Sequence, residues 1–283
     1  LPEEEFLFND TNGFSSTVHL CSGVGECLKK DKGVMCPSFR ATEDEEHSTR
    51  GRANALRLAI SGQLEDGINN ERLKDALSLC LSCKACKTEC PSNVDMARLK
   101  SQVYSWNYRK NGVDLRTRIF LNAPLLARKL SGGSAKWVNK LMNLPIAKIF
   151  ADRFLGIARE RELPPFSSSP LIEYASSMNK IDGQNKVVLF ADTYTSFHED
   201  HIGRKAIRLL ENLGFDVKLF AKGCCQRPAL SLGLLEKAKV NGQKTILDLF
   251  EFAGDAPVIV LEPGCASALI DDLPDLLDDR EMS

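Results

Sequence analysis

Several features that mark common protein classes are missing from this sequence. No apolar run approaches the ~20 residues of a membrane-spanning helix, and no signal peptide opens the chain. No phosphate-binding glycine loop and no serine, histidine and acid arrangement stands out, so catalysis by those groups has no support. The net charge is only −1, and no nucleic-acid motif is recognised. We therefore expect a cytoplasmic protein that binds no nucleic acid.

Cysteine is present in an informative pattern. The chain has ten cysteines, seven before residue 91 and three after residue 223. In a reducing compartment, thiols are more often metal ligands than disulfides. Cys80, Cys83, Cys86 and Cys90, followed by Pro91, form C-x2-C-x2-C-x3-C-P, the spacing of bacterial ferredoxins. Zinc sites usually have two separated C-x2-C pairs. The run therefore indicates an iron–sulfur cluster and electron transfer.

An earlier cysteine group is a degenerate copy of this run. Three cysteines two residues apart can hold one cluster, whereas the fourth is directed at a different cluster. Aligned on the run, the earlier group supplies Cys21, Cys27 and Cys36-Pro37, with Val24 in place of a cysteine. Exchange of ligands between the two groups predicts one complete [4Fe–4S] cluster, held by Cys36, Cys80, Cys83 and Cys86.

The remaining thiols leave the second site open. Cys21, Cys27 and Cys90 would provide only three ligands. Three thiolates allow a three-iron cluster, a four-iron cluster with a non-cysteine ligand such as His19, or no second cluster.

The polypeptide around these cysteines is expected to be helical. Ser48 is a candidate N-cap for a helix at 50–61, and Asn70 begins a helix that runs into Cys80. Residues 98–161 carry 14 basic and 3 acidic groups in further helical patterns. A solvated helix face packed on the protein is the simpler interpretation of this charge, with an anionic membrane surface or an acidic partner as alternatives.

The last third of the chain alternates between strands and helices. We expect strands at 186–191, 215–220 and 257–261, with helices at 199–213, 230–252 and 266–277. This order predicts a parallel sheet. Cys224 and Cys225 follow the second strand, Cys265 the third, and Thr193 the first. Ligands bind at this edge of open α/β sheets, so these thiols form a candidate site for a cluster, a redox-active dithiol or a docking pocket.

Together these patterns predict an α+β protein. A small all-helical, ferredoxin-like iron–sulfur domain would precede an incomplete α/β parallel-sheet cysteine-rich domain. The expected divisions are a linker from an upstream domain at 1–20, the helical iron–sulfur domain at 21–112, a basic helical segment with a Pro/Ser-rich linker at 113–185, and the α/β domain at 186–283.

The motifs resemble a known family. C-S-G-V-G-E-C, H-S-T-R-G-R-A-N and the C-x2-C-x2-C-x3-C-P run are similar to the iron–sulfur part of FAD-linked D-2-hydroxyacid dehydrogenases, such as D-lactate dehydrogenase and glycolate oxidase-like proteins. C-C-Q-R-P-A-L and L-E-P-G-C-A-S-A-L resemble the cysteine-rich CCG domain that follows it. Thr193 and Gln226 stand where such domains usually have cysteine and glycine, and only Cys265 remains of a terminal C-x2-C. A cluster in this domain is therefore as open as a redox-silent or quinone-facing role.

The resemblance implies an electron-transfer module. FAD, on a missing domain or partner flavoprotein, would oxidise the hydroxyacid and pass electrons through the [4Fe–4S] cluster to an acceptor such as a quinone or carrier protein. The chain lacks a flavin domain and starts at Leu1, so we expect a fragment. Peripheral contact with the inner face of the membrane is an accompanying possibility. Alternatives are a subunit like those of heterodisulfide reductase or lactate utilisation, and a structural zinc or interaction module.

Residues beside the ligands are expected to tune the cluster. Arg50, Arg52 and Arg57 are candidates for supporting it. Lysines near the cysteines would favour the reduced state unless they are simply solvated. These lysines are Lys29, Lys30, Lys84 and Lys87.

Overall fold

The structure is a computed structural model that describes residues 1–176 and 185–277. Residues 177–184, in the expected linker, and 278–283, at the expected end of the last domain, lie outside the described residues. The chain divides into two compact units. Unit 1 contains Leu1–Gly112, Pro228–Val240 and Ile270–Ser283, and unit 2 contains Val113–Arg227 and Asn241–Leu269. No helix in the described residues is both long and apolar enough to cross a membrane.

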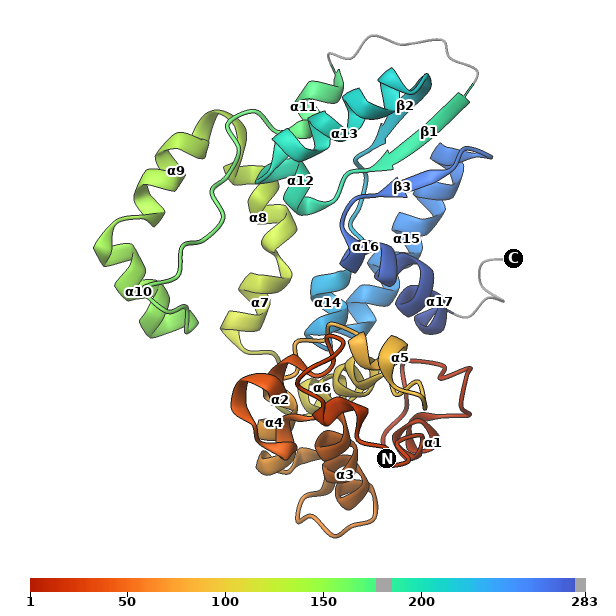
Figure 1. The fold of residues 1–283 in the computed structure, drawn as a ribbon. Coiled ribbons are helices and arrows are strands. Elements are labelled where there is room, and N and C mark those ends of the chain that lie inside the picture. Colours follow the sequence, from red (N-terminus) through yellow and green to blue (C-terminus); the bar gives the residue numbers. More distant parts are fainter. Residues whose placement is uncertain (177–184, 278–283) are drawn as a thin grey trace. The chain divides into compact units, whose positions relative to one another are not determined.

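Unit 1 is helical (Figure 1). Its first 112 residues form the helices α1 (Phe14–His19), α2 (Pro37–Thr42), α3 (Thr49–Ile60), α4 (Glu71–Ser78), α5 (Ala85–Glu89) and α6 (Met96–Asn111). The later segments add most of α14 (Arg227–Ser231), the start of α15 (Leu235–Ala253), and α17 (Leu273–Leu276).

Side-chain caps define where the helices of unit 1 begin. The Ser48 hydroxyl accepts a hydrogen bond from the Gly51 N–H at 3.0 Å, and the Asn70 side chain accepts one from the Arg72 N–H at 2.9 Å. Both caps satisfy backbone donors that the first helical turn leaves unpaired. The expected starts of α3 and α4 are therefore confirmed to within one residue.

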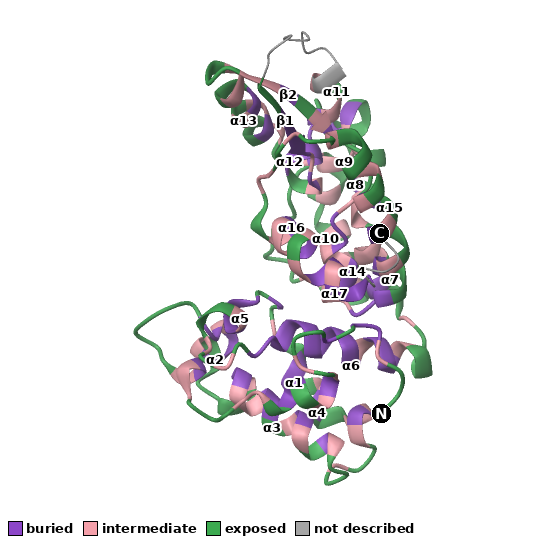
Figure 2. Ribbon diagram, turned by 90° about the vertical axis from the view of Figure 1, so that its right-hand side faces the viewer, coloured by how far each residue is buried: buried purple, intermediate pink, exposed green. Residues whose placement is uncertain are grey.

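Helix α6 forms the centre of unit 1 and is buried along most of its length (Figure 2). Trp106 packs edge-to-face on Phe14, whose ring in turn contacts Phe8. On another side, the Ser101 hydroxyl donates to the carbonyl of Leu230 at 2.6 Å. These contacts join the chain's beginning and its 228–240 segment to one helix.

Unit 2 contains a three-stranded parallel sheet of β1 (Asn185–Phe190), β2 (Phe215–Phe220) and β3 (Val258–Val260), in the order β2-β1-β3. Its core joins β1 and β2 to helices, through Leu171, Val187, Leu189, Ile207 and Val217. The helices are α7 (Leu115–Leu121), α8 (Ala123–Leu130), α9 (Ala135–Met142), α10 (Pro145–Leu155), α11 (Leu171–Ser176), α12 (Thr193–Phe197), α13 (Asp200–Asn212), the rest of α15, and α16 (Pro263–Ser267).

The coarse fold expectation is confirmed, because the described residues form a mostly helical protein with a small parallel sheet. The expected long helix at 230–252 is instead two helices, α14 and α15. The break follows from Gly233, whose φ of 74° lies in the left-handed region that ends helices. The expected helix at 266–277 is likewise α16, a π-helical turn at 268–272, and α17.

Candidate metal centres

The cysteine run at 80–90 lies on a tightly turned loop between α4 and α6. Ser82 and Lys84 both have left-handed backbone conformations, with φ of 53° and 59°. These turns reverse the chain between Cys80 and Cys86, and short helix α5 then carries the chain on to Cys90. The first three cysteines therefore face one site and the fourth faces another.

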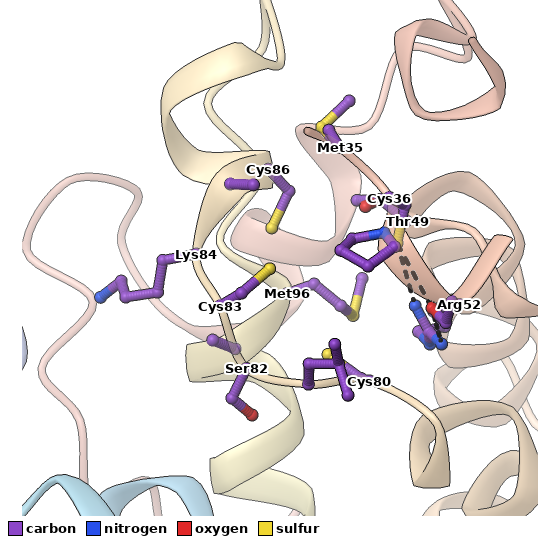
Figure 3. A pocket seen from close by; sticks show the side chains of 15 residues that line it. Met35, Cys36, Thr49, Arg52, Cys80, Ser82, Cys83, Lys84, Cys86 and Met96 are labelled. Atoms are coloured by element: carbon purple, nitrogen blue, oxygen red, sulfur yellow. Dashed lines mark hydrogen bonds between the residues drawn. The ribbon is translucent and has the colours of Figure 1, made fainter. Parts of the chain in front are cut away.

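Four cysteines line the first cavity, which encloses about 330 Å³ (Figure 3). Cys80 and Cys83 come from the loop, Cys86 from α5, and Cys36 from the residue before α2. The wall between them includes Met35 and Met96. This grouping is the one that ligand exchange between the two cysteine groups requires.

Three cysteines line a second cavity of about 280 Å³. They are Cys21, Cys27 and Cys90, and the exposed Val24 stands where the pattern would place a fourth. The hydroxyls of Ser22 and Ser92 lie 3.0 Å apart beside these thiols. His19 is exposed at the end of α1 and is not among the lining residues, so the structure does not bring it to this site.

A buried arginine contacts the first cavity. Arg52 is fully buried, and its Nη1 donates to the Cys36 sulfur at 3.4 Å (Figure 3). Its other nitrogens donate to the Ser38 hydroxyl at 2.8 Å and the Ala76 carbonyl at 2.7 Å. Burial raises the pKa of Cys36, but the Ser38 hydrogen bond and the Arg52 charge outweigh burial and lower that pKa.

A second buried cation approaches the same cysteines. The Lys100 ammonium donates to the Cys80 carbonyl at 2.6 Å and lies over the Tyr104 ring. Burial lowers its pKa. Within the described residues, no carboxylate forms an ion pair with Lys100 or Arg52. A buried positive charge needs a compensating negative charge nearby. The cavity is therefore suited to an anionic group.

The donor set fits an iron–sulfur cluster. Four cysteine sulfurs around one enclosed space are the ligands that such clusters use, and the two unpaired cations would balance the negative charge of ligated thiolates. Burial raises the pKa of Cys86, so this thiol is protonated when no cation is bound. Metal coordination deprotonates thiols outright.

The lysines near the cysteines do not supply the free charge expected of them. Lys84 is buried and pairs with Asp95, Asp271 and Asp272, with Nζ–O distances of 3.0 Å to Asp95 and 2.7 Å to Asp272. Lys87 also pairs with Asp271. At the surface, Lys29 pairs with Glu26 and Lys30 with Glu43, each at 2.6 Å. Each of the four has a carboxylate partner, which offsets its charge.

The arginines proposed as supports do lie beside the cysteines. The Arg50 backbone N–H points to the Cys27 sulfur at 3.4 Å, and Arg57 donates to the Cys21 carbonyl. Burial raises the pKa of Cys27, and the Arg50 hydrogen bond opposes that rise. Sequence reasoning missed Lys100. Its position one helical turn after Met96, which lines the first cavity, was the available signal.

The cysteines of unit 2 meet at the carboxyl ends of the strands, as the topology predicts. The sulfurs of Cys225 and Cys265 are 2.8 Å apart. Cys224 lies beside Cys225 and the Thr193 hydroxyl, and its interactions with Cys225 together with burial raise its pKa. Gln226 has a φ of 61°, a conformation that glycine adopts more easily. This explains why glycine suits the position.

Comparisons with known proteins agree with the geometry of unit 1. Residues 15–94 match the protein-family model described as "4Fe-4S dicluster domain". This range includes all seven cysteines of the two cavities.

Curated relatives extend the similarity along the chain. D-2-hydroxyglutarate dehydrogenase of Escherichia coli K12 is 26% identical over 245 residues, which cover 69% of this chain and 24% of that protein. One subunit of the anaerobic glycerol-3-phosphate dehydrogenase of the same strain is 27% identical over 145 residues, covering 50% and 37%. The probable glycolate oxidase iron-sulfur subunit of Bacillus subtilis is 36% identical over 80 residues, covering 28% and 16%.

The match is partial, because the chain spans about a quarter of the length of the D-2-hydroxyglutarate dehydrogenases. No solved structure matches the chain. The resemblance drawn from the cysteine motifs is nevertheless confirmed. The chain contains a match to the 4Fe-4S dicluster domain and is similar to the iron–sulfur region of FAD-linked dehydrogenases.

Proposed function

We propose that this chain is the electron-transfer module of a flavin-dependent D-2-hydroxyacid dehydrogenase. The observation that carries the proposal is the grouping of Cys36 with Cys80, Cys83 and Cys86 around one cavity that also meets two unpaired buried cations. These four residues would hold a [4Fe–4S] cluster, which supplies one-electron chemistry when bound.

The protein's own residues set the conditions for that chemistry. Arg52 and Lys100 hold positive charge beside the cysteines, which favours the more negative, reduced state. Met35 and Met96 keep the cavity wall apolar, and low polarity strengthens each electrostatic contact. The ferredoxin-like description of this helical unit belongs to the same proposal.

The second cavity would hold a further cluster through Cys21, Cys27 and Cys90. With Val24 in the fourth position, a three-iron cluster matches the three thiols directly. A four-iron cluster would take a hydroxyl or water as its remaining ligand. The separation of Cys90 from the other cysteines of its run supports two sites rather than one.

The partners follow from the relatives' names and from the chemistry. A flavoprotein domain or a separate flavoprotein with bound FAD would oxidise a 2-hydroxyacid, with 2-hydroxyglutarate, glycolate and lactate as candidates. The acceptor would be a quinone or a carrier protein, reached in the cytoplasm or at the inner face of the membrane.

A second candidate function is favoured by one observation in unit 2. Cys224, Cys225 and Cys265 meet at the strand ends, as a reactive or cluster-binding site requires. The chain would then act as a subunit like those of heterodisulfide reductase or lactate utilisation. Replacing Cys224 and Cys225 by serine separates the two functions, because electron transfer through unit 1 alone would be unchanged.

The test of the main proposal is anaerobic reconstitution followed by iron, sulfide and zinc analysis. About four irons per chain are expected if one site fills, and seven or eight if both fill. Cys36→Ser should lower iron by about four per chain, whereas Cys90→Ser should spare that site. Cys224→Ser serves as the matched control outside unit 1. Tightly held zinc without iron would instead establish the structural zinc module.

A further inference from the structure

Helices α9 and α10 present a large apolar surface that nothing in the described structure covers. In α10, Ile146, Ile149, Phe150 and Phe154 share one face by their helical spacing, and none of the helix's residues is buried. The exposed fractions of Phe150 and Phe154 are 59% and 61%, although their rings stack 4.5 Å apart. An apolar helix face of this kind is normally covered.

Helix α9 continues this surface. Trp137 and Leu141 are one helical turn apart and are 76% and 61% exposed, while Ala135 is the helix's one buried residue. Helices α9 and α10 pack on each other and lie away from the strands of unit 2 (Figure 1). We call the exposed side chains of Trp137, Leu141, Ile146, Phe150 and Phe154 the α9–α10 face.

The surroundings of this face are strongly basic. Residues 113–161 contain ten basic and three acidic side chains. Asp114 caps α7 through Thr117, and Asp152 pairs with Arg159 at 2.6 Å, so two of the acids are already engaged. In the described residues, Arg159 is the one basic side chain of this segment that forms an ion pair. Lys136, Lys140, Lys148 and Arg153 on α9 and α10 are therefore free to meet external negative charge.

We infer that the α9–α10 face binds the surface of a membrane that contains anionic lipids. Helices that lie in a bilayer interface combine Trp, Phe and Leu with Lys and Arg in this way. Anionic headgroups would complement the basic side chains. The acyl boundary accepts protruding rings without a matching pocket, whereas an acidic protein would need a shaped pocket for each. This contact goes beyond the proposed electron transfer and does not depend on it.

The test is co-sedimentation of the reconstituted chain with vesicles. One set is phosphatidylcholine alone, and the other contains equal parts of phosphatidylcholine and phosphatidylglycerol. We expect binding to the mixed vesicles that weakens as salt is added. F150S/F154S should reduce partitioning at least about tenfold through lost apolar contact, and K136Q/K140Q by a similar factor through lost charge. F250S, which removes an equally exposed phenylalanine from α15, should leave binding unchanged.

Tryptophan fluorescence gives an independent readout, because the chain has only two tryptophans. Trp106 is 3% exposed and should not respond, whereas emission from Trp137 should shift to the blue on the mixed vesicles and W137F should abolish the shift. Absence of binding, equal binding to both vesicle types, or unchanged binding of F150S/F154S would overturn the inference. Self-association that F150S/F154S abolishes, without vesicle binding, would assign the face to a second copy instead.

Discussion

At the scale of single residues, the candidate site depends on charges that lack ordinary partners. Arg52 is fully buried and contacts a sulfur, a hydroxyl and a carbonyl, but no carboxylate in the described structure. Lys100 donates to a carbonyl beside Cys80. Lys84, by contrast, has three carboxylates around it. Arg52 and Lys100 are therefore the cations expected to influence the reduction potential.

Replacing Arg52 by methionine should lower the midpoint potential of the first cluster. The variant removes a positive charge and a hydrogen bond to the Cys36 sulfur, both of which favour the reduced state. The expected change is roughly tens of millivolts, since a tenfold change in a one-electron equilibrium corresponds to about 59 mV. Arg52→Lys should fall between the two. Potentiometric titration measures the effect.

The matched control for this prediction is Arg72→Met, because Arg72 is an exposed arginine on the neighbouring helix α4. It should leave the potential unchanged. Equal shifts in Arg72→Met and Arg52→Met would contradict a specific role for Arg52.

At the scale of elements, the cysteine loop is held by a distant part of the chain. Lys84 connects the loop to Asp271 and Asp272, and the Asp275 carbonyl accepts from the Leu7 N–H at 2.8 Å. All of these residues belong to unit 1. The segment at 270–277 therefore stabilises the loop that positions the candidate ligands.

Lys84→Met should destabilise unit 1 by about 3–5 kcal/mol, because it leaves buried carboxylates without a counter-charge. Burial favours a neutral Lys84, but its three carboxylates raise its pKa and keep it charged. Lys87→Met removes a more exposed pair and should cost at most about 1 kcal/mol. Denaturant unfolding compares the two, and equal losses would rule out this account of the loop.

A second prediction concerns the junction between α14 and α6. A Cβ on Gly233 would lie 2.4 Å from the Tyr104 Cβ and 2.8 Å from the Ser101 carbonyl oxygen. Gly233→Ala should therefore lower the free energy of unfolding by about 2–4 kcal/mol. Gly62→Ala has a similar positive φ and open space around it, so it should cost only about 1 kcal/mol. Thermal unfolding of both variants checks the difference.

Local signals predicted much of the fold, because they depend on neighbouring residues. The apolar run at 215–220 matches β2 residue for residue, and the Ser48 cap marks the start of α3. The placement of 228–240 and 270–277 in unit 1 depends on contacts such as Ser101 with Leu230, which are 129 residues apart. No periodicity carries that information. The same distance effect hid the pairing of Lys84 with Asp271.

At the scale of the whole molecule, the cysteine spacing carried the most information about the candidate site. Spacing alone divided seven cysteines into a group of four and a group of three, and the cavities have the same composition. Spacing could not identify Lys100, because any basic residue on α6 has the same pattern before the helix is packed. The exposed α9–α10 face likewise required a structure, because an amphipathic sequence is equally typical of a packed helix.

The central claim is that the chain transfers single electrons through cysteine-bound clusters. The most direct test is an anaerobic redox titration of the reconstituted chain followed by EPR. The account predicts a signal that appears on one-electron reduction and disappears on reoxidation, and that Cys36→Ser removes or alters. Bound metal without a paramagnetic state at any accessible potential would contradict it.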